Sequence, residues 1–325
     1  MSFEIPKETN VGKIHKVTLG ATPEQGGTRS QTITIGGSTA LPFLFFEGEH
    51  PHRPVIAMEV FDKIPGKYPD TLMDYFRNVI DKPGEMAKKC VEQYGAELIS
   101  VRLEGTHPEK GNKSVDEAAE IVKQVLESVS VPLIITGHSH FEKINKVMKK
   151  VCEVTEGENC LINYVEKDNY KTIAAACIAY KHAIVAQTPI DVNLAKQLNI
   201  LLTDMNFPPE KIVMDPLTGT LGYGLEYTYS IMERIRNDGL AGDKMLAFPM
   251  LINPGYESSR VKEARVSEQE YPEWGKKELR SAYWEISTAM SLLVAGAELL
   301  IMHHPKAVEI VKKKIIEMFD SKKGD

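Results

Sequence analysis

A glycine-rich stretch, DPLTGTLGYGLEYTYSIMERI, runs from Asp215 to Ile235 and has the composition of a ligand-binding turn. Phosphate-binding loops follow G-x-x-x-x-G-K-[ST], in which the lysine reaches the phosphates. Here Gly219, Gly222 and Gly224 follow G-x-x-G-x-G, and the next lysine is Lys244. A dinucleotide fingerprint needs G-x-G-x-x-G after the first strand, with an acid about 20 residues later. The stretch therefore predicts no nucleotide site.

The same stretch offers hydrogen-bonding groups beside a predicted strand that ends at Asp215. Thr218, Thr220 and Tyr223 supply hydroxyls, and the three glycines let the backbone approach a ligand closely. The predicted helix that follows, over residues 225–235, has free N–H groups at its start. We expect a hydrogen-bonding rim for the edge of a large polar ligand. The alternative is a tight turn that only packs.

Further polar residues follow the other predicted strands, where the carboxyl ends of parallel strands meet at one face. We expect Thr136, Asn163, Glu166, Gln187, Thr188, Asn253 and His303 to bind a ligand there with Asp215, and Arg102, Glu104, His138, His140, Asp191 and His304 share the face. His138-Ser139-His140 has the spacing of two zinc ligands, but no third ligand is identifiable, so we expect no metal site. No Ser–His–Asp or Cys–His arrangement predicts a catalytic residue.

Eight apolar runs must position these residues. They begin at Val55, Glu97, Pro132, Cys160, Ala183, Lys211, Met245 and Glu298. The runs lack period-2 alternation, which is typical of strands buried on both faces of a parallel sheet. Helical stripes separate them: Pro83 is expected to open one helix, and Ser114 with Glu117 to form a capping box before another.

Eight strand–helix units in about 270 residues predict an α/β fold of the (β/α)8 barrel type, a TIM barrel. A doubly wound open sheet is the alternative. We expect the barrel over residues 55–320. Residues 1–54 contain HKVTL, TITIG and LPFLFF and predict a β-hairpin extension that closes the bottom of the barrel. The turn-rich stretch from Asn253 to Glu273 predicts a long loop over the top face.

Composition excludes several classes of protein. The chain has 325 residues and a net charge of −6, which argues against nucleic-acid or anionic-membrane partners. No apolar run approaches the ~20 residues that span a bilayer. The first ten residues, MSFEIPKETN, lack a signal pattern, so we expect a cytoplasmic protein. The four cysteines form no C-x-x-C pair and predict no iron–sulfur cluster on this chain.

Several long segments resemble one family, the small (delta) subunit of the corrinoid iron–sulfur protein of the acetyl-CoA (Wood–Ljungdahl) pathway. They are the glycine-rich stretch itself, GATPEQGGTRSQTITIGG, FEGEHPHRPVIAMEVFD, YKHAIVAQTPIDVNLAKQLNILLTDMN, GDKMLAFPM and WGKKELRSAYWE. The resemblance covers nearly the whole chain.

The resemblance implies an accessory subunit that is not catalytic alone. Its partner would be a large subunit with a [4Fe–4S] cluster and a corrinoid-binding domain, and the two chains would hold a cobamide between them. The cobamide would accept a methyl group from methyltetrahydrofolate through a separate methyltransferase and donate it to acetyl-CoA synthase/CO dehydrogenase. The barrel top, including Thr218, Thr220 and the glycines, would shield the reactive corrinoid face.

A weaker resemblance supplies an alternative function. Pterin-dependent methyltransferases are also (β/α)8 barrels that hold the pterin with strand-end Asp and Asn residues. Asn163, Asp215 and Asn253 stand at comparable strands, whereas Thr136-Gly137-His138 replaces the expected Asp of the third strand. We therefore interpret the three residues as remnants of a shared barrel site that now faces the corrinoid. A purely structural subunit without ligand contact is the third possibility.

Overall fold

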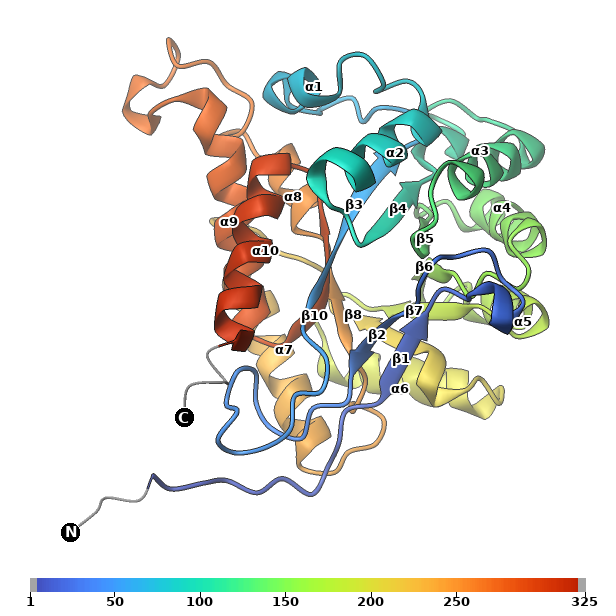
Figure 1. Cartoon of the computed structure of the whole chain (residues 1–325), viewed down its shortest axis with the longest axis vertical. Helices are drawn as coiled ribbons and strands as arrows, with labels where there is room; N and C mark the ends of the chain where they lie inside the picture. The colour runs from blue at the N-terminus through green and yellow to red at the C-terminus, as the bar shows by residue number, and fades with distance from the viewer. Residues whose placement is uncertain (1–4, 321–325) are drawn as a thin grey trace.

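Eight parallel strands close into a barrel in the computed structural model, which describes residues 5–320 (Figure 1). The strands lie in the order β10-β3-β4-β5-β6-β7-β8-β9. This closed order confirms the (β/α)8 barrel and excludes the open sheet. The barrel strands are β3 (Val55–Phe61), β4 (Leu98–Arg102), β5 (Leu133–Thr136), β6 (Leu161–Val165), β7 (Ala183–Gln187), β8 (Ile212–Asp215), β9 (Met250–Ile252) and β10 (Ala297–Met302).

The helices follow the barrel strands, and all but the short helix after β9 cover the outside of the barrel and bury apolar side chains against it. They are α1 (Asp70–Phe76), α2 (Pro83–Tyr94), α3 (Val115–Ser128), α4 (Phe141–Val154), α5 (Tyr170–Tyr180), α6 (Val192–Asp204), α7 (Leu225–Leu240), α8 (Pro254–Arg260), α9 (Lys277–Val294) and α10 (Pro305–Asp320), with 3-10 turns at Pro23–Gln25, Glu104–Thr106, Pro209–Lys211 and Pro272–Trp274.

Both predicted helix starts are confirmed. Pro83 is the first residue of α2. Ser114 Oγ accepts from Glu117 N at 3.1 Å, and Glu117 Oε2 accepts from Ser114 N at 2.6 Å, which completes the capping box of α3. Within residues 5–320, no helix is long and apolar enough to cross a membrane.

An antiparallel hairpin precedes the barrel. Its strands are β1 (Lys16–Leu19) and β2 (Ile33–Gly36). Val17, Leu19 and Ile35 are fully buried and belong to one apolar cluster with residues from all eight barrel strands, including Leu98 near the start of β4. The hairpin therefore packs against the amino-terminal end of the barrel. The division at residue 54 stays a prediction, and residues 1–4 lie outside the described part of the chain.

Two predicted segments are wrong in detail. LPFLFF forms turns instead of a strand, because Phe43 has φ of +62° and Leu44 N donates to Leu41 O. The run MLAFPMLI yields a strand only over Met250–Ile252, after Pro249. Proline has no N–H to give to the sheet, so the earlier part of that run leaves the barrel.

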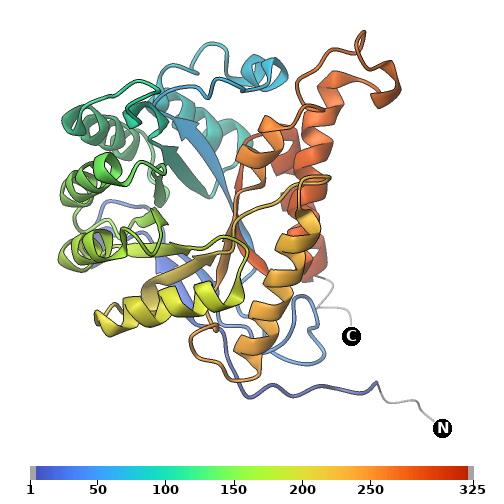
Figure 2. The ribbon, with the colours of Figure 1, turned by 180° about the vertical axis from the view of Figure 1, so that it is seen from behind.

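The predicted loop after β9 also contains a helix. Pro254 begins α8, and the Asn253 side chain caps it by accepting from Tyr256 N at 3.1 Å. The residues between α8 and α9 then project at the end of the molecule opposite the chain termini (Figures 1 and 2). The segment is therefore a helix followed by a projecting loop, and the helix lies beside the carboxyl ends of the strands.

Candidate functional site

A polar cavity of about 530 Å³ opens at the carboxyl ends of the barrel strands. The barrel closes these ends into one ring, so residues from distant parts of the chain meet there. Of the residues expected to bind a ligand, eight line it: Thr136, Asn163, Gln187, Asp215, Thr218, Gly219, Tyr223 and Asn253. Residues from α8, from the β4–α3 connection, from the ends of β4 and β6 and from the turns after β5, β7 and β8 form the rest of the wall.

Three of the expected residues build the turn beside the cavity and do not line it. Thr220 O accepts from Tyr223 N at 2.9 Å, and Gly222 and Gly224 have φ of +73° and +115°. A Cβ on Gly219 would lie 2.5 Å from the carbonyl oxygen of Gly224. The glycines therefore serve the close backbone approach within this turn, which then presents Thr218 and Tyr223 to the cavity.

Glu166, Thr188 and His303 also lie outside the cavity lining. Glu166 is half-buried in the turn after β6, where its N–H donates to Asn169 Oδ1 at 2.8 Å. Thr188 is buried, and its N–H donates to Asp215 O at 3.0 Å. His303 is fully buried directly after β10, where its ring bonds the buried carboxylate of Glu59.

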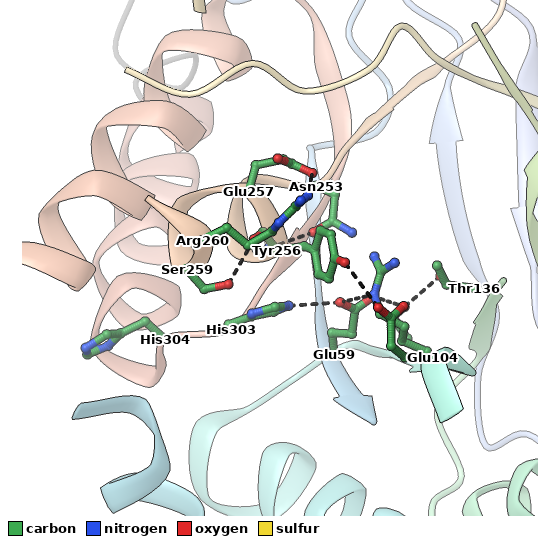
Figure 3. A network of polar contacts seen from close by, with 12 residues as sticks. Glu59, Glu104, Thr136, Asn253, Tyr256, Glu257, Ser259, Arg260, His303 and His304 are labelled. Carbon is green, nitrogen blue, oxygen red and sulfur yellow. Dashed lines mark hydrogen bonds and ion pairs between the residues drawn. The ribbon is translucent and has the colours of Figure 1, made fainter. Parts of the chain in front are cut away.

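A buried carboxylate, Glu59 of β3, organises the interior beneath the cavity (Figure 3). Its Oε1 accepts from Ser100 Oγ at 3.0 Å, and its Oε2 contacts Arg102 Nε at 2.8 Å and His303 Nε2 at 2.9 Å. Burial opposes ionisation, but the Arg102 charge and the hydrogen bonds outweigh it and lower the pKa of Glu59 to about 2. Burial lowers the pKa of His303, so its neutral ring donates through Nε2 to the carboxylate.

Arg102, at the end of β4, carries this network up to the cavity. Its guanidinium carbon lies 3.9 Å from the centroid of the Tyr256 ring, which stacks on it from α8. Tyr256 Oη lies 3.5 Å from Glu104 Oε1, and Lys110 pairs with the same carboxylate. Neither Glu59 nor Tyr256 was among the residues predicted for this site. Glu59 could have been noticed as the one acid within the otherwise apolar strand VIAMEVF.

The remaining floor is a chain of hydroxyl and amide groups. Thr136 Oγ1 lies 3.1 Å from Ser100 Oγ, and Asn163 Nδ2 donates to Thr136 Oγ1 at 3.4 Å. Thr218 Oγ1 accepts from Asn253 N at 2.7 Å. These bonds join neighbouring strand ends, so the floor is held rigidly and can meet a ligand without rearrangement.

Asp215 differs from Glu59 because it forms no ion pair with any cation of the described residues. Its Oδ1 accepts from Leu217 N at 2.8 Å. Burial raises the pKa of Asp215 to about 7, against the lowering effect of that backbone bond. Near neutral pH, the carboxyl group can therefore present either a donor or an acceptor to the cavity.

The family model for the CO dehydrogenase/acetyl-CoA synthase delta subunit matches residues 16–314. The chain belongs to this family. It is 40% identical over 317 residues to acetyl-CoA decarbonylase/synthase complex subunit delta of Archaeoglobus fulgidus, covering 96% of this chain and 70% of that one. The corresponding subunit of Methanocaldococcus jannaschii is 35% identical over 315 residues, with 96% and 76% covered. The resemblance found in the sequence is confirmed.

Solved structures with the same barrel include dihydropteroate synthases. One from Xanthomonas albilineans has a TM-score of 0.54 at 14% identity, covering 83% of this chain and 95% of that chain. One from Thermus thermophilus has a TM-score of 0.54 at 14% identity, covering 86% and 99%. At this identity the likeness shows the fold alone.

In this delta-family chain, His138 lines the cavity and is held by internal bonds. His138 Nδ1 accepts from His140 N at 3.2 Å, and its Nε2 lies 2.9 Å from Thr106 Oγ1. Burial and the neighbouring His107 lower the pKa of His138 to about 4. The part of the chain that is described contains no group of three or more His, Cys, Asp or Glu residues that could hold a metal ion. All four cysteines are free and buried.

Proposed function

We propose that this chain is the small subunit of a heterodimeric corrinoid iron–sulfur protein and that its cavity face covers the reactive face of a cobamide. When bound, the cobamide supplies the chemistry of methyl transfer, accepting the group from methyltetrahydrofolate through a separate methyltransferase and donating it to acetyl-CoA synthase/CO dehydrogenase. Membership of the delta-subunit family is the observation that carries this proposal. A cytoplasmic location belongs to the same proposal.

The cavity has a size suited to covering part of a cobamide, and it is too small to enclose the whole molecule. Pockets of roughly 300–1,000 Å³ enclose drug-sized ligands, and a cobamide has several times as many atoms. A cavity of about 530 Å³ therefore takes only a part of the cobamide and leaves the rest to a partner. The large subunit supplies this second half and, with its own cysteines, the [4Fe–4S] cluster.

The cavity groups fit the amide-bearing edge of a corrinoid. Thr136, Asn163, Asp215, Thr218 and Asn253 offer hydroxyl, amide and carboxyl groups, which form hydrogen bonds to neutral polar substituents. Their role is to bind, to orient and to exclude water. The shielding matters because a reduced corrinoid is a strong nucleophile and reductant that water and oxidants would consume.

Purification of the chain with and without the large subunit tests the proposal. We expect cobamide absorption and iron only in the complex. Cobamide or iron on the isolated chain would overturn the proposal that the large subunit carries the cluster and that both subunits are needed to hold the cobamide. Within the complex, Thr136→Val should weaken cobamide retention because it removes a hydroxyl of the cavity floor. Thr155→Val is the matched control, since Thr155 is equally buried but bonds Val151 O on α4. Equal retention by both variants would favour a purely structural subunit.

Methyltetrahydrofolate binding is the alternative, favoured by the meeting of Asn163, Asp215 and Asn253 in one cavity. Thr136 ends β5 where a pterin would need a carboxylate to accept from its N–H groups. Calorimetric titration of the isolated chain with methyltetrahydrofolate decides between the two. Absence of binding heat at millimolar ligand would remove this alternative.

A further inference from the structure

Arg102 reaches the cavity with most of its hydrogen-bonding capacity unused. Its side chain is 7% exposed and lines the cavity. Nε donates to Glu59, but neither terminal nitrogen makes a hydrogen bond to any residue within 5–320. A guanidinium carries five N–H donors, so four are left for a ligand. The two terminal nitrogens are not sealed within the protein, so they face the cavity and are open to a ligand. Hydrogen bonds from a charged donor are among the stronger ones that a ligand can gain.

The orientation of this guanidinium is set in advance. Glu59 holds it from one edge and is itself fixed by Ser100 and His303. The Tyr256 ring covers one flat side at 3.9 Å. The planar fork therefore loses little freedom when a ligand binds, which is the condition for a specific contact.

The charges around Arg102 select against an anionic ligand. Glu59 neutralises the guanidinium at 2.8 Å. Glu104 and Glu257 line the same cavity, and among residues 5–320 each pairs with one basic side chain, Lys110 and Arg260 respectively. A carboxylate or phosphate added here would meet these acids at a site whose lining cations are already paired. A neutral oxygen acceptor accepts hydrogen bonds from the two terminal nitrogens of Arg102 without that repulsion.

We propose that Arg102 recognises a neutral carbonyl oxygen, that of a carboxamide or lactam, on the ligand of this cavity. The inference rests on the proposed function and specifies which chemical group of the ligand Arg102 binds. The acetamide and propionamide side chains of a corrinoid supply such an oxygen, and so does the lactam of a pterin. Loading with cobinamide and titration with methyltetrahydrofolate distinguish these two sources.

The test measures how strongly the chain associates with its large subunit, empty or loaded with cobinamide, by calorimetry. The gain in affinity on loading reports contacts between this chain and the corrinoid. Arg102→Lys keeps a cation beside Glu59 but loses the fork, so at least about a tenfold reduction of that gain is expected. Arg236→Lys is the matched control, because Arg236 is 2% exposed and pairs with Glu298 at 2.8 Å near the opposite end of the barrel. It should keep the full gain.

Each outcome decides something different. A full gain in Arg102→Lys overturns the inference while the proposed function stands. If cobinamide gives no gain even with the unmodified chain, corrinoid covering fails, and titration with methyltetrahydrofolate becomes the test. At least about a tenfold weaker methyltetrahydrofolate affinity in Arg102→Lys then assigns the lactam, whereas equal affinity or no binding overturns the inference. The double variant Arg102→Met/Glu59→Gln removes the charge pair together and should show the same loss if Arg102→Lys does not fold.

Discussion

Removing the cation from the buried Arg102–Glu59 pair should destabilise the fold strongly and in a pH-dependent way. Glu59 has no exposed side-chain surface, so Arg102→Met leaves a buried carboxylate without its counter-charge. Breaking a buried pair in this manner costs about 3–5 kcal/mol. We expect a decrease of that size in the free energy of unfolding at pH 7.

The pKa of Glu59 supplies an independent magnitude. It falls from 4.5 to about 2 on folding, and a difference of about 2.5 units corresponds to about 3 kcal/mol. Because the folded pKa lies below the unfolded value, this contribution is fully present above about pH 4.5 and is lost as the pH falls toward 2. Without Arg102, burial dominates and raises the pKa of Glu59, so the variant gains stability on acidification. The difference between the two proteins should therefore shrink between pH 7 and pH 4.

Urea unfolding at pH 7 and pH 4, followed by circular dichroism, measures both effects. Arg53→Met is the control, because the Arg53–Glu97 pair is partly exposed, at 34% and 14%, and such pairs contribute at most about 1 kcal/mol. A loss below about 1 kcal/mol for Arg102→Met at pH 7, or a difference that stays constant down to pH 4, would show that Arg102 does not hold the buried charge of Glu59.

Three further predictions concern the cavity, the hairpin and the glycine turn. Asp215→Asn should raise the free energy of unfolding at pH 8 by up to about 4 kcal/mol and leave it nearly unchanged at pH 4. The pKa of Asp215 is about 7 in the folded chain against 3.8 for an ordinary aspartate, so ionisation of Asp215 destabilises the fold as the pH rises between these values. Urea titrations showing no gain at pH 8 would contradict this prediction. Leu19→Ala should cost about 2–5 kcal/mol because Leu19 is fully buried under the barrel, whereas Val11→Ala, at an 86% exposed position, should cost almost nothing; equal midpoints would disprove the packing. Gly219→Ala should destabilise by at least about 1 kcal/mol, since its Cβ would meet Gly224 O at 2.5 Å, while Gly66→Ala meets nothing within 4 Å; thermal melts that do not separate the two variants would count against the turn geometry.

Much of the architecture could be predicted because burial leaves a mark on composition. Strands covered on both faces read as continuous apolar runs, and all eight runs contain a barrel strand. The predicted strands are wrong where a single residue prevents part of an apolar run from forming a strand. Pro249 delays the start of β9, and the positive φ of Phe43 turns a chain that hydrophobicity alone would extend. Such local backbone events depend on neighbours that a pattern of apolar residues does not contain.

The position of the candidate site could be predicted from the sequence, but the residues that line it could be predicted only in part. The carboxyl ends of parallel strands meet at one face whatever the details, so Thr136, Asn163 and Asp215 could be assigned there together. Alternation within a strand end then decides which side chain faces the cavity. Thr188 follows Gln187 directly, yet Gln187 lines the cavity and Thr188 does not. A shift of one residue reverses that choice, and only the register of the closed barrel sets it.

Periodicity, resemblance and residue spacing are properties of the linear chain, and they sufficed to predict the barrel, the family and the lack of a cysteine pattern for a metal cluster. The electrostatics of the site, in contrast, emerged only from the folded arrangement. Glu59 and Asp215 are both buried acids near one cavity, but Arg102 lies against the first, and no cation in the described part of the chain bonds the second. Their pKa values move in opposite directions for that reason. Distances of a few ångströms between side chains from different strands control ionisation, and no linear pattern encodes them.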